Sequence, residues 1–118
     1  MSLSKHQLMN ETELKYKEVK AEIYNFRAWT STSNIQSLVD TMNKALEFAG
    51  YTVLKFVDYQ FPVKGYTSLW LLAESHLALH YFEEQAKCYI ELSGCNPTMN
   101  LAFRDFLKQK ELDYELIE

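Results

Sequence analysis

The sequence predicts an α+β fold, a two-layer sandwich in which two helices lie on one face of a mostly antiparallel sheet. The first helix is indicated by apolar residues at helical spacing that stop just before Gly50: Ile35, Leu38, Val39, Met42, Leu46 and Ala49. The second is indicated by Asn96-Pro97, an N-cap followed by a proline suited to the first helical position. The element order suggests pseudo-repeated strand-helix-strand-strand halves, although the halves share no visible sequence repeat.

The amino-terminal elements are expected in the following order. Residues 1–15 are polar and charged, which predicts a flexible or short helical arm. Residues 18–26 alternate loosely and predict a strand. Residues 30–34 form a polar stretch rich in N-cap residues, which predicts the loop before the first helix.

The elements after Gly50 follow from similar signals. Residues 51–60 are rich in β-branched and aromatic side chains and predict a strand, and residues 62–65 predict a turn. The apolar face of the second helix, which begins after Asn96, consists of Ala102, Phe103, Phe106 and Leu107. A closing strand is predicted by the alternation of Leu112, Tyr114 and Leu116.

Residues 68–92 fit two interpretations. Leu, Ala, Glu, His and Gln favour a helix, and the apolar spacing from Leu69 onwards fits the helical period. A set of strands is the alternative, and the residues by themselves leave the choice open.

The bulk properties limit the class of protein. A length of 118 residues fits one domain, residues 1–118, and an apolar content of 47% suffices for a buried core. The formal net charge is −4 and no basic patch stands out, so nucleic acid is not an expected partner. The apolar run at residues 69–73 is far shorter than the roughly 20 residues of a membrane helix, so no membrane contact is expected. Cys88 and Cys95, without an apolar leader, predict two free thiols and a cytoplasmic location.

A constellation of reactive residues lies between residues 67 and 95. Glu74-Ser75 closes an apolar run, His80 lies five residues after Ser75, and Cys95 lies twenty after it. Through the stretches Glu74-Ser75-His76-Leu77-Ala78-Leu79-His80 and Leu92-Ser93-Gly94-Cys95, the chain resembles the self-processing site of prokaryotic-type S-adenosylmethionine decarboxylases. The resemblance implies strands over residues 68–92, with the scission point between two neighbouring ones.

The resemblance also implies a chemistry. The hydroxyl of Ser75 attacks the Glu74 carbonyl, the chain is cut between these residues, and Ser75 becomes a pyruvoyl group. Thr67 and His80 take the supporting roles of stabilising the oxyanion and removing the α-proton. The pyruvoyl ketone can hold a substrate α-amine as a Schiff base and act as an electron sink for decarboxylation. Cys95 then protonates the carbon, although the helix start beside it could equally hold a thiolate there.

The same resemblance implies a substrate and an assembly. Phe61 and Phe82 stand where two rings sandwich the adenine, and Glu84 stands where a carboxylate binds the ribose hydroxyls. The expected substrate is S-adenosylmethionine, whose decarboxylation supplies polyamine (spermidine) synthesis. The expected assembly is a homodimer of processed protomers.

Other functions stay open at this point. The same pyruvoyl chemistry could act on a basic amino acid, or the chain could be an unprocessed relative that binds a ligand or regulates a partner. A zinc site is a further alternative, because His76, His80, Glu84 and Cys88 would share one face of a helix. On a strand the two imidazoles would be roughly 13 Å apart, at about 3.3 Å per residue, so we expect no metal ion.

Overall fold

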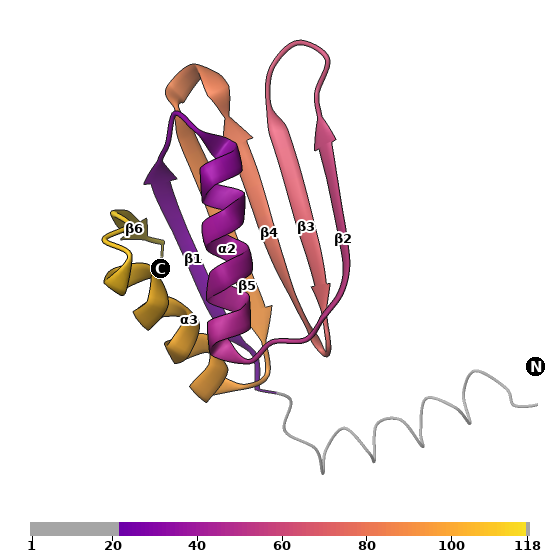
Figure 1. The fold of residues 1–118 in the computed structure, drawn as a ribbon, viewed down its shortest axis with the longest axis vertical. Helices are drawn as coiled ribbons and strands as arrows, with labels where there is room; N and C mark the ends of the chain where they lie inside the picture. Colours follow the sequence, from indigo (N-terminus) through magenta and orange to yellow (C-terminus); the bar gives the residue numbers. More distant parts are fainter. Residues whose placement is uncertain (1–21, 118) are drawn as a thin grey trace, which may run out of the picture.

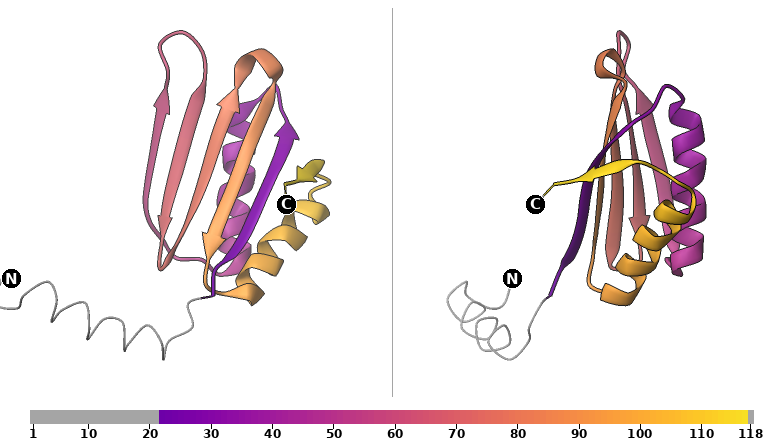
Figure 2. Two further views of the ribbon diagram at one scale, coloured as in Figure 1. Left: turned by 180° about the vertical axis from the view of Figure 1, so that it is seen from behind. Right: turned by 90° about the vertical axis from the view of Figure 1, so that its left-hand side faces the viewer.

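The computed structural model describes residues 22–117 as one antiparallel sheet with two helices packed on one of its faces (Figures 1 and 2). In chain order the elements are β1 (Tyr24–Ser31), α2 (Ile35–Ala49), β2 (Val53–Gln60), β3 (Tyr66–Leu72), β4 (Ser75–Phe82), the short 3₁₀ helix η1 (Glu83–Gln85), β5 (Lys87–Gly94), α3 (Pro97–Gln109) and β6 (Tyr114–Leu116). The six strands are ordered β2-β3-β4-β5-β1-β6 across the sheet.

The predicted fold class is confirmed. Every strand pair is antiparallel, and Figure 2 shows α2 and α3 together on one side of the sheet. The first half of the chain follows the order strand, helix, strand, strand, whereas the second half places two strands before its helix. None of the helices within residues 22–117 is long and apolar enough to cross a membrane.

The helix α2 has the bounds that its sequence predicts, because both of its ends carry specific stop signals. The side chain of Asn34 accepts a hydrogen bond from the backbone N–H of Ser37 at 3.1 Å, which satisfies one free donor of the first turn. Gly50 ends the helix with φ 89°, a conformation that glycine adopts without a Cβ penalty. In the same way, Asn96 caps α3 through the N–H of Met99 at 3.0 Å.

The first strand lies later in the chain than predicted. The prediction placed it over residues 18–26 and a loop over 30–34, but β1 runs from Tyr24 to Ser31. Residues 18–21 and the predicted arm at 1–15 lie outside the described residues. The prediction failed at Thr30, a polar residue that is typical of loops. In the structure its hydroxyl is buried and donates to the carbonyl of Asp113 at 2.6 Å. A satisfied hydroxyl can occupy an inward position of a strand.

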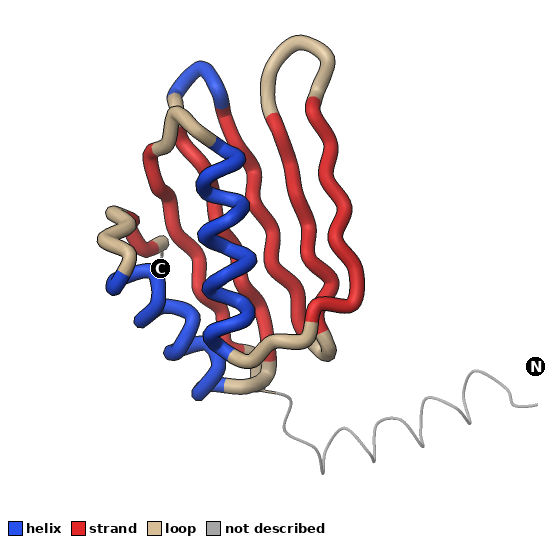
Figure 3. The backbone as a smooth tube through the Cα atoms, in the orientation of Figure 1, coloured by secondary structure: helices blue, strands red, loops and turns tan. Residues whose placement is uncertain are grey.

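The ambiguous residues 68–92 lie mainly in the strands β3, β4 and β5, with the short η1 between β4 and β5 (Figure 3), as the family resemblance implies. In β4, Leu77, Leu79 and Tyr81 are buried at every second position, and in β5 Cys88, Ile90 and Leu92 follow the same period. Burial at every second residue is typical of a strand in a sheet with one covered face. Tertiary packing therefore overrides the local helical propensity of these residues. The turn at 62–65 and the closing strand at Tyr114–Leu116 are also confirmed, and the strand predicted at 51–60 begins at Val53.

The hydrophobic core lies between the sheet and the two helices. Its largest side chains are fully buried: Trp70, Phe26, Phe103, Met42 and several leucines. The indole N–H of Trp70 on β3 donates to Asn43 Oδ1 on α2 at 2.8 Å, so the helix is tied to the sheet by a specific bond as well as by apolar contact.

The opposite face of the sheet carries no helix among the described residues (Figure 2). Strand alternation places there the side chains that do not point towards the helices. We call this surface the open face and define it by eight residues: Val57, Tyr59, Thr67, Leu69, Leu71, His76, His80 and Phe82. Several are large and exposed, including Leu69 (43%) and Leu71 (54%), so the open face presents a substantial apolar surface to solvent.

Two leucines of α3 provide a matched test of this packing. Leu107 is fully buried, whereas Leu101 is 56% exposed. We expect Leu107→Ala to lower the free energy of unfolding by about 2–5 kcal/mol, because a cavity remains in the core. Leu101→Ala should change it by less than about 0.5 kcal/mol. Urea denaturation followed by circular dichroism measures both, and equal losses would show that α3 packs through a different face.

Candidate active site

A two-residue turn joins β3 to β4 at the peptide bond where the family resemblance implies cleavage. Leu72 and Ser75 are paired in the β3–β4 register, so Ala73 and Glu74 alone form the turn. Glu74 has φ 60°, the left-handed region that side chains other than glycine rarely occupy. Such a conformation costs about 1–2 kcal/mol, so the residue before Ser75 holds local strain.

Two neighbouring segments hold this turn in place. The N–H of Ala73 donates to the carbonyl of Thr52 at 3.1 Å, which ties the turn to the link between α2 and β2. On the other side, Ser75 is paired with Gly94 at the end of β5. A Cβ atom added at Gly94 would lie 2.5 Å from Ser75 Oγ and 3.2 Å from Ser75 Cβ. The absence of a side chain at Gly94 therefore creates the space that the Ser75 side chain fills.

Cys95 lies beside the same turn. Its Sγ is 3.8 Å from Glu74 Oε2, and the residue is exposed and not in a disulfide. It stands two residues before the first residue of α3, at the end of the helix where the macrodipole is positive. Cys88, the other free cysteine, is buried, and burial raises the pKa of its thiol to about 12. Of the two cysteines, Cys95 is therefore the one whose thiol is exposed.

The hydroxyl of Tyr51 also approaches Ser75, a contact that the sequence pattern did not predict. Its oxygen would lie 3.6 Å from the same added Cβ at Gly94. Tyr51 is buried, and its hydroxyl has no hydrogen-bond partner among residues 22–117. Burial, and to a lesser extent the nearby charge of Cys95, raises the pKa of this phenol. The sequence signal was only that Tyr51 follows the helix stop at Gly50.

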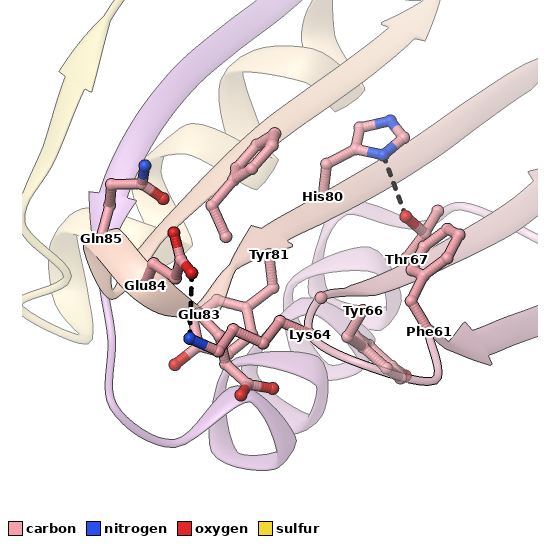
Figure 4. A pocket seen from close by; sticks show the side chains of 11 residues that line it. Phe61, Lys64, Tyr66, Thr67, His80, Tyr81, Glu83, Glu84 and Gln85 are labelled. Atoms are coloured by element: carbon pink, nitrogen blue, oxygen red, sulfur yellow. Dashed lines mark hydrogen bonds and ion pairs between the residues drawn. The ribbon is translucent and has the colours of Figure 1, made fainter.

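A second cluster lies at the other end of β3 and β4. Thr67 and His80 are opposite each other in the register, and Thr67 Oγ1 is 3.2 Å from His80 Nδ1 (Figure 4). The His80 ring stacks on Tyr89 of β5, with ring centroids 6.1 Å apart and planes at 22°. The imidazole is therefore held between Thr67 and Tyr89, and the structure brings Thr67 and His80 together.

The residues expected to bind the substrate surround this second cluster. Phe61, Phe82 and Glu84 line one open cavity of about 470 Å³ together with Thr67 and His80 (Figure 4). The carboxylate of Glu84 forms an ion pair with Lys64 at 2.9 Å. The aromatic rings, the carboxylate and the hydroxyl–imidazole pair thus belong to one site.

The two clusters are separated within one protomer. Ser75 begins β4, and His80 lies five residues further along the same strand, which corresponds to roughly 16 Å at about 3.3 Å per residue. Figure 1 shows the β3–β4 turn at one end of the sheet and η1, beside the second cluster, at the other. Ser75, Gly94 and Cys95 therefore meet, whereas Thr67 and His80 do not reach them within one chain.

The strand geometry also bears on the alternative metal site. His76 and His80 are both in β4, four residues apart, so their imidazoles cannot chelate one ion. Within residues 22–117 no group of three His, Cys, Asp or Glu side chains is placed to hold a metal ion.

Comparisons with known proteins give the family of the chain. Residues 17–113 match the family model described as S-adenosylmethionine decarboxylase. An S-adenosylmethionine decarboxylase proenzyme of Syntrophomonas wolfei is 32% identical over 85 residues, which cover 71% of this chain and 66% of the relative. A proenzyme of the same name from Prochlorococcus marinus is 34% identical over 71 residues, covering 59% and 57%. The matched stretches thus span less than two thirds of these relatives.

A solved structure shows the same fold. The crystal structure of the adenosylmethionine decarboxylase from Aquifex aeolicus superposes with a TM-score of 0.65 at 20% identity, over 85% of this chain and 92% of that one. At this identity the similarity concerns the fold, whereas the family model spans most of the sequence. On that match, the chain belongs to the S-adenosylmethionine decarboxylase family.

Proposed function

We propose that this chain is a proenzyme that cleaves itself between Glu74 and Ser75 and then decarboxylates S-adenosylmethionine with a pyruvoyl group made from Ser75. Its relatives carry the name of proenzymes of this activity. The observation that carries the proposal is the turn itself: a strained Glu74, bonded to a serine whose side chain fills the space at Gly94 and flanked by an exposed thiol.

The cleavage chemistry needs no bound cofactor and no co-reactant other than water. The Ser75 hydroxyl adds to the Glu74 carbonyl and converts the amide to an ester, and loss of the Ser75 α-proton then expels the Glu74 carboxylate. The remaining dehydroalanine tautomerises to an imine, and water hydrolyses the imine to a pyruvoyl group at the new amino end with release of ammonia. Gly94 leaves room beside residue 75, because a Cβ there would lie 2.5 Å from Ser75 Oγ. When present, the group supplies an electron sink for decarboxylation.

Cys95 is suited to deliver a proton at the same place. Its thiol is exposed and lies beside Glu74, so it can face a substrate held at residue 75. The buried thiol of Cys88 cannot take this role, because β5 points it into the core.

Cleavage is tested by the intact mass of the purified protein under denaturing conditions. We expect two fragments, residues 1–74 and 75–118, with the second lacking a free amine. Ser75→Ala should remain one chain, because it lacks the nucleophile. A single mass for the unmodified protein after long incubation would contradict the proposal and favour an unprocessed, ligand-binding relative.

We further propose that the working unit is a homodimer in which each active site uses both chains. Within one protomer, Ser75 and Cys95 lie at one end of the sheet, and Thr67 and His80 lie at the other. Two copies stacked through their open faces in antiparallel directions would set the first cluster of each chain against the second cluster of its partner. A two-fold axis produces both composite sites at once.

The open face supports such an interface. It exposes Leu69, Leu71, Val57 and Tyr59 at 43–57%, and a shallow groove of about 290 Å³ runs between β2, β3 and the start of β4. A two-layer sandwich with one bare apolar face gains by covering it, and a second copy of the same face is chemically matched to it.

Mixing two inactive variants tests the composite site. Ser75→Ala cannot be cut, and His80→Ala should not be cut in a homodimer because the α-proton is not removed. In a coexpressed mixture, the His80→Ala chain pairs with a partner that supplies an intact His80. About half of the His80→Ala chains should then be cleaved, as random pairing in a two-fold dimer predicts.

The mixture also has a clear negative outcome. If His80→Ala chains stay intact in the mixture while the unmodified protein is cleaved, the site is formed within one protomer. A double variant carrying both substitutions, mixed with unmodified protein, serves as the control because it should remain intact itself.

The cavity at the second cluster is suited to an adenosyl group. Phe61 and Phe82 offer two aromatic faces, and Glu84 offers a carboxylate for vicinal hydroxyls. The ion pair between Glu84 and Lys64 joins two exposed side chains, and such pairs contribute about 1 kcal/mol or less, so a ligand can displace it.

Removal of one aromatic ring tests whether the substrate is an adenosyl compound or a plain amino acid. Phe61→Ala should raise KM for S-adenosylmethionine by roughly 5- to 150-fold, since stacking of a base on an aromatic ring is worth about 1–3 kcal/mol. Steady-state kinetics on the cleaved enzyme measure it. Val63→Ala, at an 89% exposed position in the same loop, is the matched control and should leave KM unchanged. An unaltered KM in Phe61→Ala would favour a basic amino acid as the substrate.

A further inference from the structure

The hydroxyl of Tyr51 is the feature of the site that family membership does not explain. Tyr51 directly follows Gly50, and its N–H donates to the carbonyl of Leu46 at 3.0 Å, so the last turn of α2 fixes its backbone. Its side chain is 7% exposed and belongs to the hydrophobic core. The next residue, Thr52, accepts the hydrogen bond from Ala73 in the scissile turn. Tyr51 is therefore held against that turn by two separate backbone bonds.

An unpartnered phenol costs stability in the folded chain. The Tyr51 hydroxyl is buried without a hydrogen-bond partner among the described residues, and a group of this kind costs about 1–3 kcal/mol. A phenylalanine would fill the same space without this cost. A buried donor that remains despite its cost is expected where an acceptor forms transiently.

Gly94 opens the path between this hydroxyl and the nucleophile. Both Tyr51 OH, at 3.6 Å, and Ser75 Oγ, at 2.5 Å, lie around the point where a Gly94 side chain would begin. The alternation of β4 directs Ser75 towards the helix-covered face, the same face as Leu77 and Leu79, and Tyr51 approaches from that face. No side chain on Gly94 stands between them.

We propose that the Tyr51 hydroxyl donates a hydrogen bond to the oxyanion that forms on the Glu74 carbonyl when Ser75 attacks it. This proposal rests on the proposed self-cleavage and assigns a catalytic residue to its first step. In the uncut chain Tyr51 OH and Ser75 Oγ lie around the same point at Gly94, without a hydrogen bond between them. The oxyanion and Ser75 Oγ are bonded to the same carbon atom in the intermediate, so its formation places a new acceptor beside the space that the two hydroxyls share.

The step is balanced within the chain. The Oγ–H of Ser75 adds across the Glu74 carbonyl, a C–O bond forms, and the carbonyl electron pair moves to the oxygen that Tyr51 bonds. The C–N bond then breaks, and the nitrogen of Ser75 takes up the proton that the hydroxyl lost. The product is an ester isomer of the original amide, so no oxidant or co-reactant is needed.

The raised pKa of the phenol agrees with this role. Burial, followed by the nearby Cys95 charge, keeps Tyr51 protonated, so it acts as a donor and not as a base. The removal of protons is then left to other groups, among which the imidazole of His80 is the candidate from the partner chain.

Tyr51→Phe provides the test, because it removes the hydroxyl and keeps the ring. We expect self-cleavage to slow by about 100- to 1,000-fold, the loss found when one oxyanion donor is removed. The melting temperature should stay the same or rise, since a buried unpaired group is lost. A merely structural role would lower stability and cleavage together. Tyr114→Phe, at a core-packed tyrosine of β6 away from the turn, is the matched control and should cleave at the normal rate.

Hydroxylamine identifies the step, because at neutral pH it cuts an ester and spares an amide. Uncut Tyr51→Phe should resist it, because the block precedes the ester. If hydroxylamine cuts Tyr51→Phe, the ester forms in this variant and the slow step comes after it, which would overturn the proposal. Cleavage of Tyr51→Phe at the normal rate would also overturn the proposal. Normal cleavage of Tyr51→Phe would leave the proposed function intact. Failure of the unmodified protein to cleave would overturn both.

Discussion

The pairing of β4 between β3 and β5 is the constraint on which the site depends. One register brings Leu72, Ser75 and Gly94 side by side at one end of the sheet, and the same register brings Thr67 opposite His80 near the other end. A shift by one residue would turn Leu77 and Leu79 out of the core, so the buried leucines fix the position of the reactive residues. The geometry of the candidate site is therefore set by hydrophobic burial and not by polar contacts within the site.

Strand alternation then places the candidate site residues on two different faces of the sheet. Ser75 belongs to the positions that face the helices, where Tyr51 lies buried, whereas Thr67 and His80 belong to the open face. Glu74, in the turn, is exposed and can be approached from outside. The scissile bond can thus be served by a donor from its own core and by an imidazole from a second chain. Ser75 and His80 are far apart within one protomer because five residues of strand separate them. In the proposed dimer they can still serve one reaction, since each would meet the other residue on the partner chain.

The sequence predicts most of the fold because its signals are local. The caps of α2 and α3 stand in the sequence as Asn34, Gly50 and Asn96-Pro97, and both helices have the predicted positions. The predicted end of β1 was wrong because Thr30 is inward by virtue of a hydrogen bond to Asp113, 83 residues away. The strands at 68–92 followed from the resemblance alone, since local propensity favours a helix there. Tyr51 could not be found at all, because its approach to Ser75 depends on the space at Gly94, which no local pattern encodes.

Two features of the uncut chain lower its folding stability. Glu74 is held at φ 60°, and Tyr51 keeps an unpaired buried hydroxyl, which together cost the precursor a few kcal/mol. The leucine-filled core can hold the turn in this state because its burial outweighs such costs. Attack by Ser75 would give the Tyr51 hydroxyl an acceptor, and scission would release Glu74 from the two-residue turn. Under the proposed cleavage, the rigid sheet that holds these two features in the uncut chain would lower the barrier to scission, because the features that destabilise the ground state would be relieved along the reaction.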